Sequence, residues 1–88
     1  MAIATLGATA AGALRNRLSD LRAAESVTDV LAGRPRNLSV NGLDCFQFDL
    51  ADQFVLTITS NHAPARLDAR GQTDWLRVRR VKVVSVEQ

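Results

Sequence analysis

The first third of the chain carries apolar residues at helical spacing. Between about Thr9 and Glu25, the residues Leu14, Leu18 and Leu21 recur at intervals of four and three positions. This spacing places them on one side of an α-helix, and it predicts an amphipathic helix whose apolar stripe faces a core.

A short second helix is predicted directly after the first. Ser26 followed by Asp29 has the residue order of a capping box, in which a hydroxyl residue precedes a helix and an acidic residue occupies its third position. The predicted helix runs through Leu31. Gly33 and Pro35 end it, because glycine favours a helix C-terminus and proline cannot continue a helix.

Beyond Arg36 the apolar pattern changes to a period of two, which is typical of strands with one buried face. The dipeptide Asn41-Gly42 is the strongest short hairpin signal, because both residues tolerate positive φ. Phe46 and Phe48 fall on one face of the strand that follows. The predicted strands are Asn37–Val40, Leu43–Leu50, Phe54–Thr59 and Arg80–Val86.

The polar segment from Asn61 to Asp74 contains Pro64 and is predicted to be a loop. Trp75 and Val78 are three residues apart, which predicts a single helical turn before the last strand. These elements predict an α+β fold in a single domain that spans residues 1–88. One or two N-terminal helices pack on an antiparallel sheet of about four strands.

The composition is that of an ordinary globular domain, with 47% hydrophobic and 23% charged residues among 88. The apolar start MAIATLGATAAGAL lacks the basic n-region of a signal peptide and leads directly into charged residues, so no leader is predicted. No stretch reaches the length of a membrane span. We therefore expect a cytoplasmic protein without membrane contact.

Few residues offer chemistry. Cys45 is the single cysteine, which excludes an internal disulfide and a cysteine-only metal site and favours a buried free thiol. His62 is the single histidine, and it is either a solvated loop residue or a general acid–base group. Asp44 and Asp49 fall on opposite faces of one strand, where they form no carboxylate dyad and are expected to be solvated. No metal site and no cofactor are predicted.

The net charge is +2, and ten of the eleven basic residues are arginine, which favours bidentate contact with phosphate or carboxylate. Such residues can neutralise phosphates along an RNA backbone. They can equally form a solvated face that protects an edge strand from aggregation, and both interpretations stay open. The candidate residues for RNA or ribosome contact are Arg36, Arg77, Arg79, Arg80 and Lys82.

Three stretches carry a family resemblance in their order and spacing. They are ALRNRLSDLRAAES at 13–26, FQFDLADQFVLTI at 46–58 and GQTDWLRVRRVKVVSV at 71–86. From about Leu6 onward the chain resembles the RelE/ParE superfamily of bacterial toxin–antitoxin systems, nearest its HigB-like or plasmid maintenance killer branch. The resemblance implies a helix-plus-sheet toxin that cleaves messenger RNA on the ribosome and is neutralised by an antitoxin. In such enzymes basic groups bind the scissile phosphate and a base activates the neighbouring 2′-hydroxyl.

The chain departs from the family at positions that carry its chemistry. Ser39-Val40 stands where relatives often have lysine–glycine, and Phe54-Val55 stands where they have tyrosine–arginine. The family's C-terminal tyrosine–histidine would follow Gln88. Relatives also begin with a further strand that we expect this chain to lack. One sheet edge would then be unpaired and open to a second copy or to a partner's strand.

Three hypotheses follow from this resemblance. The first is a toxin of a type II toxin–antitoxin system that inhibits translation as an mRNA endoribonuclease, with His62 as a candidate for proton transfer. The second is a degenerate, non-catalytic member that acts by binding an antitoxin or another protein, and the missing family residues favour it. A gyrase-directed toxin, as on the ParE side of the superfamily, is a third.

Overall fold

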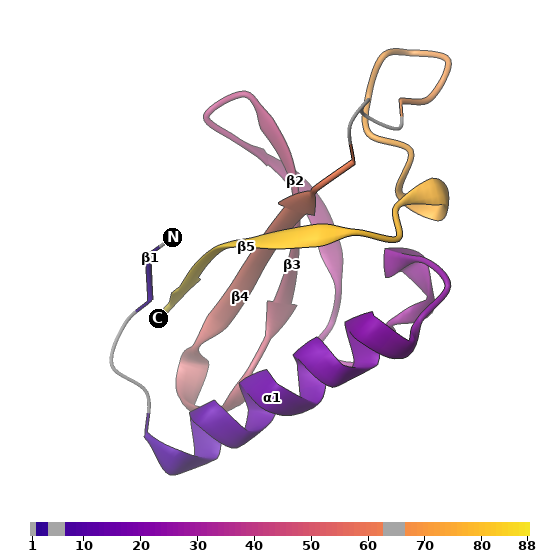
Figure 1. Cartoon of the computed structure of the whole chain (residues 1–88). Coiled ribbons are helices and arrows are strands. Elements are labelled where there is room, and N and C mark those ends of the chain that lie inside the picture. Colours follow the sequence, from indigo (N-terminus) through magenta and orange to yellow (C-terminus); the bar gives the residue numbers. More distant parts are fainter. Residues whose placement is uncertain (1, 4–6, 63–66) are drawn as a thin grey trace.

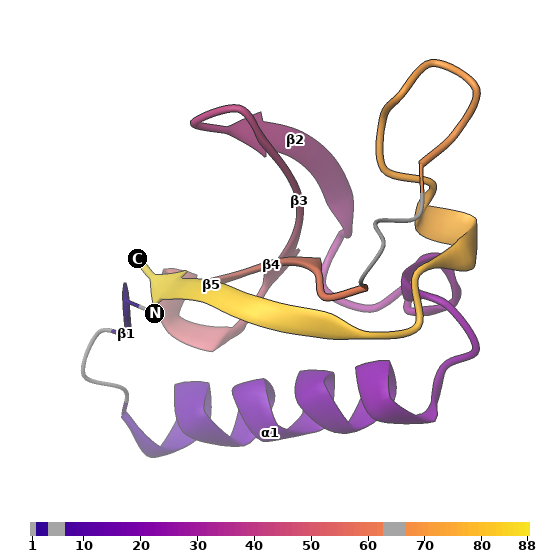
Figure 2. The ribbon, with the colours of Figure 1, turned by 45° about the horizontal axis from the view of Figure 1, so that its top comes forward.

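A curved five-stranded sheet lies on one long helix in the computed structural model, which describes residues 2–3, 7–62 and 67–88 (Figures 1 and 2). The predicted loop residue Pro64 and the proposed start of the resemblance at Leu6 lie outside the described residues. In chain order the elements, with η marking a 3-10 turn, are β1 (Ala2–Ile3), α1 (Ala8–Ala23), η1 (Val27–Asp29), β2 (Arg36–Val40), β3 (Leu43–Asp49), η2 (Ala51–Gln53), β4 (Val55–Ser60), η3 (Trp75–Arg77) and β5 (Val81–Glu87).

The strand order is β1-β5-β4-β3-β2, with β2 to β5 forming an antiparallel meander. The α+β prediction of a helix on an antiparallel sheet of about four strands is confirmed. The expectation that an N-terminal strand is missing is wrong. The two residues of β1 pair in parallel with Ser85 and Val86 of β5, so this part of the β5 edge is covered.

The predicted apolar stripe of α1 is confirmed. Leu14, Leu18 and Leu21 pack against the buried core, and Ala10 is fully buried near the start of the helix. The helix α1 lies against one face of the sheet (Figure 2), and this inner face contributes large side chains to the core. Those with no solvent exposure are Phe48, Leu56, Ile58 and Val86.

The predicted second helix is wrong, since only the 3-10 turn η1 forms there. The capping signal is real, because the Asp29 carboxylate accepts a hydrogen bond from the Ser26 N–H (3.3 Å). Val27, however, donates its N–H to the Val78 carbonyl (3.2 Å). Val30 is extended and buried, so the chain leaves the helical path to fill the core.

The turn η3 closes the core beyond the C-terminal end of α1. The predicted single turn is confirmed, and Trp75 and Val78 are both buried. The Trp75 ring meets the Phe46 ring edge-on, with centroids 5.1 Å apart, a favourable aromatic geometry. Since a 3-10 helix has three residues per turn, burying these two positions leaves Leu76 and Arg77 facing solvent.

The predicted hairpins form with small changes in strand bounds. Asn41 and Gly42 have φ of 52° and 79°, as the two-residue turn requires. A bulge between β4 and β5 was not predicted. Thr57 pairs with Ser85 and Ile58 with Val83, so Val84 is an additional residue in β5.

Gly33 lets the η1–β2 connection lie directly on β3. Its φ is +87°, and a Cβ atom there would stand 2.8 Å from the Asp49 carbonyl oxygen and 3.3 Å from the Phe48 Cβ. The Gly33 carbonyl also accepts the Asp49 N–H at 2.6 Å. Gly42 and Gly71 share the positive φ but have open space where a Cβ would be.

We predict that Gly33→Ala lowers the free energy of unfolding by roughly 2–4 kcal/mol, because a left-handed backbone and a clash with β3 add together. Gly42→Ala and Gly71→Ala should each lower the free energy of unfolding by only about 1 kcal/mol, since the left-handed backbone is unfavourable there but the added Cβ meets no other atom. Urea denaturation of the three variants measures the difference. Equal losses would contradict the close approach of Gly33 to β3.

Candidate nucleic-acid interface

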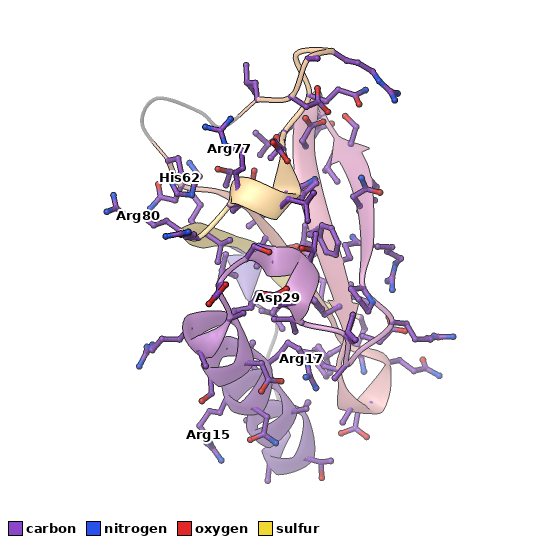
Figure 3. All side chains as sticks on the ribbon, turned by 90° about the vertical axis from the view of Figure 1, so that its right-hand side faces the viewer. Arg15, Arg17, Asp29, His62, Arg77 and Arg80 are labelled. Atoms are coloured by element: carbon purple, nitrogen blue, oxygen red, sulfur yellow. The ribbon has the colours of Figure 1, made fainter. Side chains whose placement is uncertain are left out.

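Three exposed arginines gather between η3 and β5. Arg77 ends η3, and Arg79 and Arg80 lead into β5. Figure 3 shows Arg77 and Arg80 beside His62 at this end of the molecule, whereas Arg15 projects from α1. We call Arg77, Arg79 and Arg80 the arginine corner. In the parts of the chain that the structure describes, no carboxylate forms an ion pair with any of the three.

His62 holds the backbone of the arginine corner. Its Nε2 atom accepts hydrogen bonds from the backbone N–H groups of Arg79 (2.8 Å) and Arg80 (3.2 Å). An imidazole nitrogen can accept only when it carries no proton, so the ring proton of the neutral form is on Nδ1. His62 lies in the loop after β4, and its ring is half-buried and oriented by main-chain groups.

The segment before η3 is more regular than the predicted loop. Leu67 and Thr73 form an isolated bridge, and the Asp68 carboxylate accepts the backbone N–H groups of Arg70 (2.8 Å) and Gln72 (3.0 Å). These contacts make a small hairpin that leads into η3.

Asp44 ties that hairpin to the sheet. Its Oδ2 atom accepts the Thr73 N–H (2.9 Å) and the Thr73 hydroxyl (3.1 Å). The Asp44 carboxylate was expected to be solvated, but it is half-buried and joins β3 to the approach to η3. The arginine corner is therefore held on one side by Asp44 through Thr73 and on the other by His62.

Arg36 lies apart from the other candidates. It is on β2, with β3 and β4 between it and β5. Its guanidinium contacts the Asp49 carboxylate at 3.0 Å, and Arg34 donates to the same carboxylate at 2.7 Å. The structure therefore does not bring Arg36 into the arginine corner, and Arg36 shares the single Asp49 carboxylate with Arg34.

The Arg34–Asp49 contact was missed, although the sequence held a signal for it. Extending the β2–β3 register back from the Asn41-Gly42 turn places Arg34 opposite Asp49. Arg34 lies two residues before Arg36, the first residue of β2. The Arg34 hydrogen bond, assisted by Arg36, holds the pKa of Asp49 below its ordinary value of 3.8, against the opposing effect of burial. No comparable local signal points to the Asp44–Thr73 contact, which joins distant segments.

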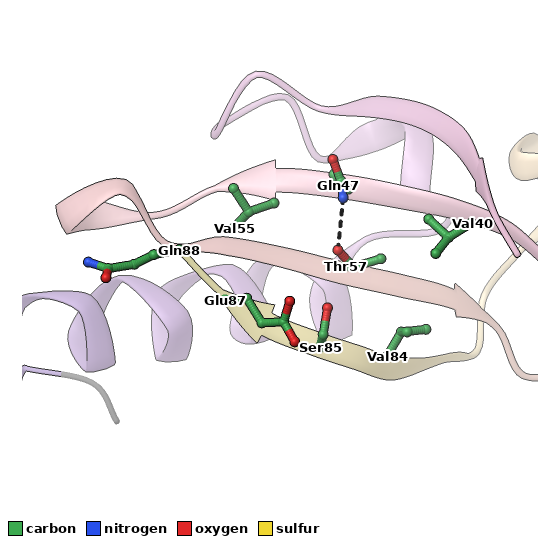
Figure 4. A pocket seen from close by; sticks show the side chains of 8 residues that line it. All are labelled: Val40, Gln47, Val55, Thr57, Val84, Ser85, Glu87 and Gln88. Atoms are coloured by element: carbon green, nitrogen blue, oxygen red, sulfur yellow. Dashed lines mark hydrogen bonds between the residues drawn. The ribbon is translucent and has the colours of Figure 1, made fainter. Parts of the chain in front are cut away.

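Lys82 is exposed on β5 and pairs with Thr59, on the sheet face that is turned away from the core cluster. The same face carries a hollow of about 290 Å³ (Figure 4). In it the Gln47 side-chain amide donates to the Thr57 hydroxyl at 3.0 Å. The described residues that line the hollow include Glu87 but no Arg, Lys or His, so its chemistry does not suit phosphate.

The remaining candidates offer no reactive centre. Cys45 is fully buried, as predicted, and burial together with the neighbouring Asp44 charge raises the pKa of its thiol, which suppresses the reactive thiolate. Within residues 2–3, 7–62 and 67–88, no group of three or more His, Cys, Asp or Glu side chains is placed to hold a metal ion.

Comparison of the chain with protein-family models, with curated proteins and with solved structures found no match. In the described part of the chain, α1 and the shorter turns are not long and apolar enough to cross a membrane.

We predict that Asp49 makes stability depend on pH in the acid range. Because the pKa of Asp49 is lowered in the folded state, its contribution is complete above about 3.8 and is lost as pH falls through the lower folded-state value. Asp49→Asn should be less stable than the native chain at pH 7, and the difference should shrink below pH 3.8. Urea denaturation between pH 7 and pH 2.5 measures this.

The matched control is Asp52→Asn, because Asp52 is an exposed carboxylate in the next turn and forms no ion pair in the described structure. Its difference from the native chain should stay constant across the same range. If the difference in free energy of unfolding between Asp49→Asn and the native chain does not become smaller in acid, the ion pairs of Asp49 with Arg34 and Arg36 are contradicted.

We predict that His62→Ala releases the backbone of the arginine corner. The amide protons of Arg79 and Arg80 lose their acceptor and should exchange faster with solvent, with a loss of about 1 kcal/mol in the free energy of unfolding. Hydrogen exchange followed by NMR measures this for each residue. Asn61→Ala is the control, because the Asn61 contact with Arg80 is made by its backbone N–H and survives the change. Unchanged exchange in His62→Ala would exclude the contact.

Proposed function

We propose that this protein is a toxin-like component of a type II toxin–antitoxin system that acts on translation by binding RNA through the arginine corner. The observation that carries the proposal is the set of three exposed guanidinium groups without a carboxylate partner in the described structure. This action belongs in the bacterial cytoplasm, and the partner that would neutralise it is a cognate antitoxin protein.

The distribution of charge supports this choice. Arg17 is paired with Asp20, and Arg34 and Arg36 share Asp49. In the described structure Arg15, Arg22 and Arg70 have no carboxylate partner either, but the arginine corner brings three such side chains together between positions 77 and 80, and their charge is available to phosphate oxygens. Guanidinium groups bind phosphate through two parallel hydrogen bonds, and each phosphate contact also releases condensed counterions.

The rigidity of the corner also supports the proposal. Its backbone is held by His62 and, through Thr73, by Asp44. A fixed backbone reduces the entropy that the arginine side chains would lose on binding RNA. The order of elements is compatible with the fold that the RelE/ParE resemblance implies, and β1 supplies the N-terminal strand that relatives carry.

The hydrogen bonds of His62 favour a second candidate function, in which the protein binds without catalysing a reaction. Cleavage at a 2′-hydroxyl needs a group that accepts its proton. His62 is the only histidine, and its Nε2 atom is already engaged by two backbone N–H groups. This favours a non-catalytic family member that binds RNA, an antitoxin or another protein without cutting a transcript.

We predict that Arg79→Ala/Arg80→Ala weakens RNA binding at least tenfold at 50 mM salt and lowers the slope of log affinity against log salt by about 2. The His62 contacts use backbone N–H groups, so the fold should survive both changes. Arg15→Ala/Arg22→Ala is the control, because it removes the same charge from exposed positions on α1. Fluorescence anisotropy with a labelled RNA measures both quantities, and equal losses in the two variants would contradict a specific site.

Induction of the protein in bacteria distinguishes the two candidates. Growth arrest with cut messenger RNA, absent in Arg79→Ala/Arg80→Ala and retained in the α1 control, supports an endoribonuclease toxin. Arrest with intact transcripts supports inhibition by binding. Unchanged growth together with no RNA affinity would contradict the toxin proposal and leave protein binding as the function.

A further inference from the structure

Leu76 is an apolar side chain that the fold holds in solvent among arginines. It is 74% exposed, and of the described large hydrophobic residues only Leu31 is comparably exposed, at 78%. Its position is imposed by the burial of its neighbour Trp75 and of Val78 in the turn η3. An exposed leucine costs free energy in water, about 1.5–3 kcal/mol relative to full burial, and gains it back when a ligand covers it.

A hollow of about 310 Å³ lies at this leucine. His62, Leu76, Arg77 and Arg79 line it. This volume is at the lower end of the range for small-ligand sites, and one nucleotide is a ligand of this class. The lining combines one apolar surface with two cationic side chains. That combination suits a ligand with a flat apolar part beside negative charge.

We infer that Leu76 packs against one unpaired base while Arg77 and Arg79 hold the phosphates on either side of it. The inference rests on the proposed function and adds to it a substrate preference, for single-stranded over double-stranded RNA. In a duplex the bases are stacked and paired, so the grooves present phosphates, 2′-hydroxyls and base edges while the apolar faces of the internal bases are covered. A duplex can therefore satisfy the arginines but cannot cover Leu76.

The site should distinguish single-stranded from double-stranded RNA but should not distinguish one base from another. Leucine has no hydrogen-bonding group, so it cannot recognise the edge of a particular base, whereas every base has an apolar face. The aromatic side chain next to it, Trp75, is buried against Phe46 and does not supply a stacking surface. Leu76 is therefore the group at this corner that an unpaired base can cover.

The test is the affinity of the full chain for a labelled 12-nucleotide RNA of mixed sequence, single-stranded and as a blunt duplex, by fluorescence anisotropy. We expect the native chain to favour the single strand by about fivefold or more. Leu76→Trp should tighten single-strand binding by about tenfold, because an aromatic ring stacks on the base, and Leu76→Ser should weaken it severalfold. Duplex affinity and the salt slope should change in neither variant.

Leu31→Trp and Leu31→Ser are the matched controls. Leu31 is as exposed as Leu76 but lies at a different hollow, with Asp20, Asp29 and the C-terminal end of α1. These variants should bind both RNAs as the native chain does. Because both leucines are exposed, none of the four substitutions removes core packing, and thermal denaturation checks this directly.

The outcomes separate this inference from the function on which it rests. If the native chain binds neither RNA, both proposals fail. If it binds single strand and duplex equally and the Leu76 variants change nothing, the base contact is overturned while phosphate binding by the arginine corner stands. If the native chain self-associates in sedimentation experiments and Leu76→Ser abolishes that association without changing RNA affinity, Leu76 serves a protein contact and the inference is again overturned.

Discussion

The packing of Trp75 and Val78 at the far end of the core is the contact on which the surface chemistry depends. The helix α1 covers most of the inner face of the sheet, and η3 closes the part beyond its C-terminal end. Trp75 rests on Phe46, and the Val78 carbonyl accepts the Val27 N–H. Once these two side chains point inward, the residues between them must point outward. The exposure of Leu76 and Arg77 is therefore a consequence of core packing.

Two groups of arginines differ in their surroundings. Arg34 and Arg36 share the Asp49 carboxylate where the chain enters β2, which offsets one of their two charges. At the arginine corner the fold supplies only backbone constraints, and the guanidinium charge stays available to a ligand. His62 belongs to the constraints, because a nitrogen whose lone pair already accepts two amide hydrogen bonds is poorly placed to take a proton from a substrate.

Local patterns predicted the elements well, and contacts between distant segments were the part they could not supply. The Asn41-Gly42 turn depends on backbone preferences of two residues and was predicted correctly. The bulge at Val84 was missed, although the sequence holds a signal for it. Val81 and Val83 face the core at odd positions and Val86 faces it at an even position, so the period of two breaks at Val84. The contact from His62 to the arginine corner has no such signal, since its donors are main-chain groups that every residue carries. Leu76 could have been identified from its place in the predicted turn, between two residues at inward spacing.

The pairing of β1 with β5 has a consequence for how the chain folds. It joins Ala2 to Ser85, whereas the hairpins of β2, β3 and β4 join residues close in sequence. Closing so long a loop loses chain entropy before any stabilising contact forms. The local meander of β2, β3 and β4 is therefore favoured to form first. The helix α1 gains its full apolar surface only after β5 has docked, because Val86 belongs to the core that it covers. We therefore expect the meeting of residues 2–3 with β5 to be a late step in folding, since it depends on the topology of the sheet more than on the strength of any single contact.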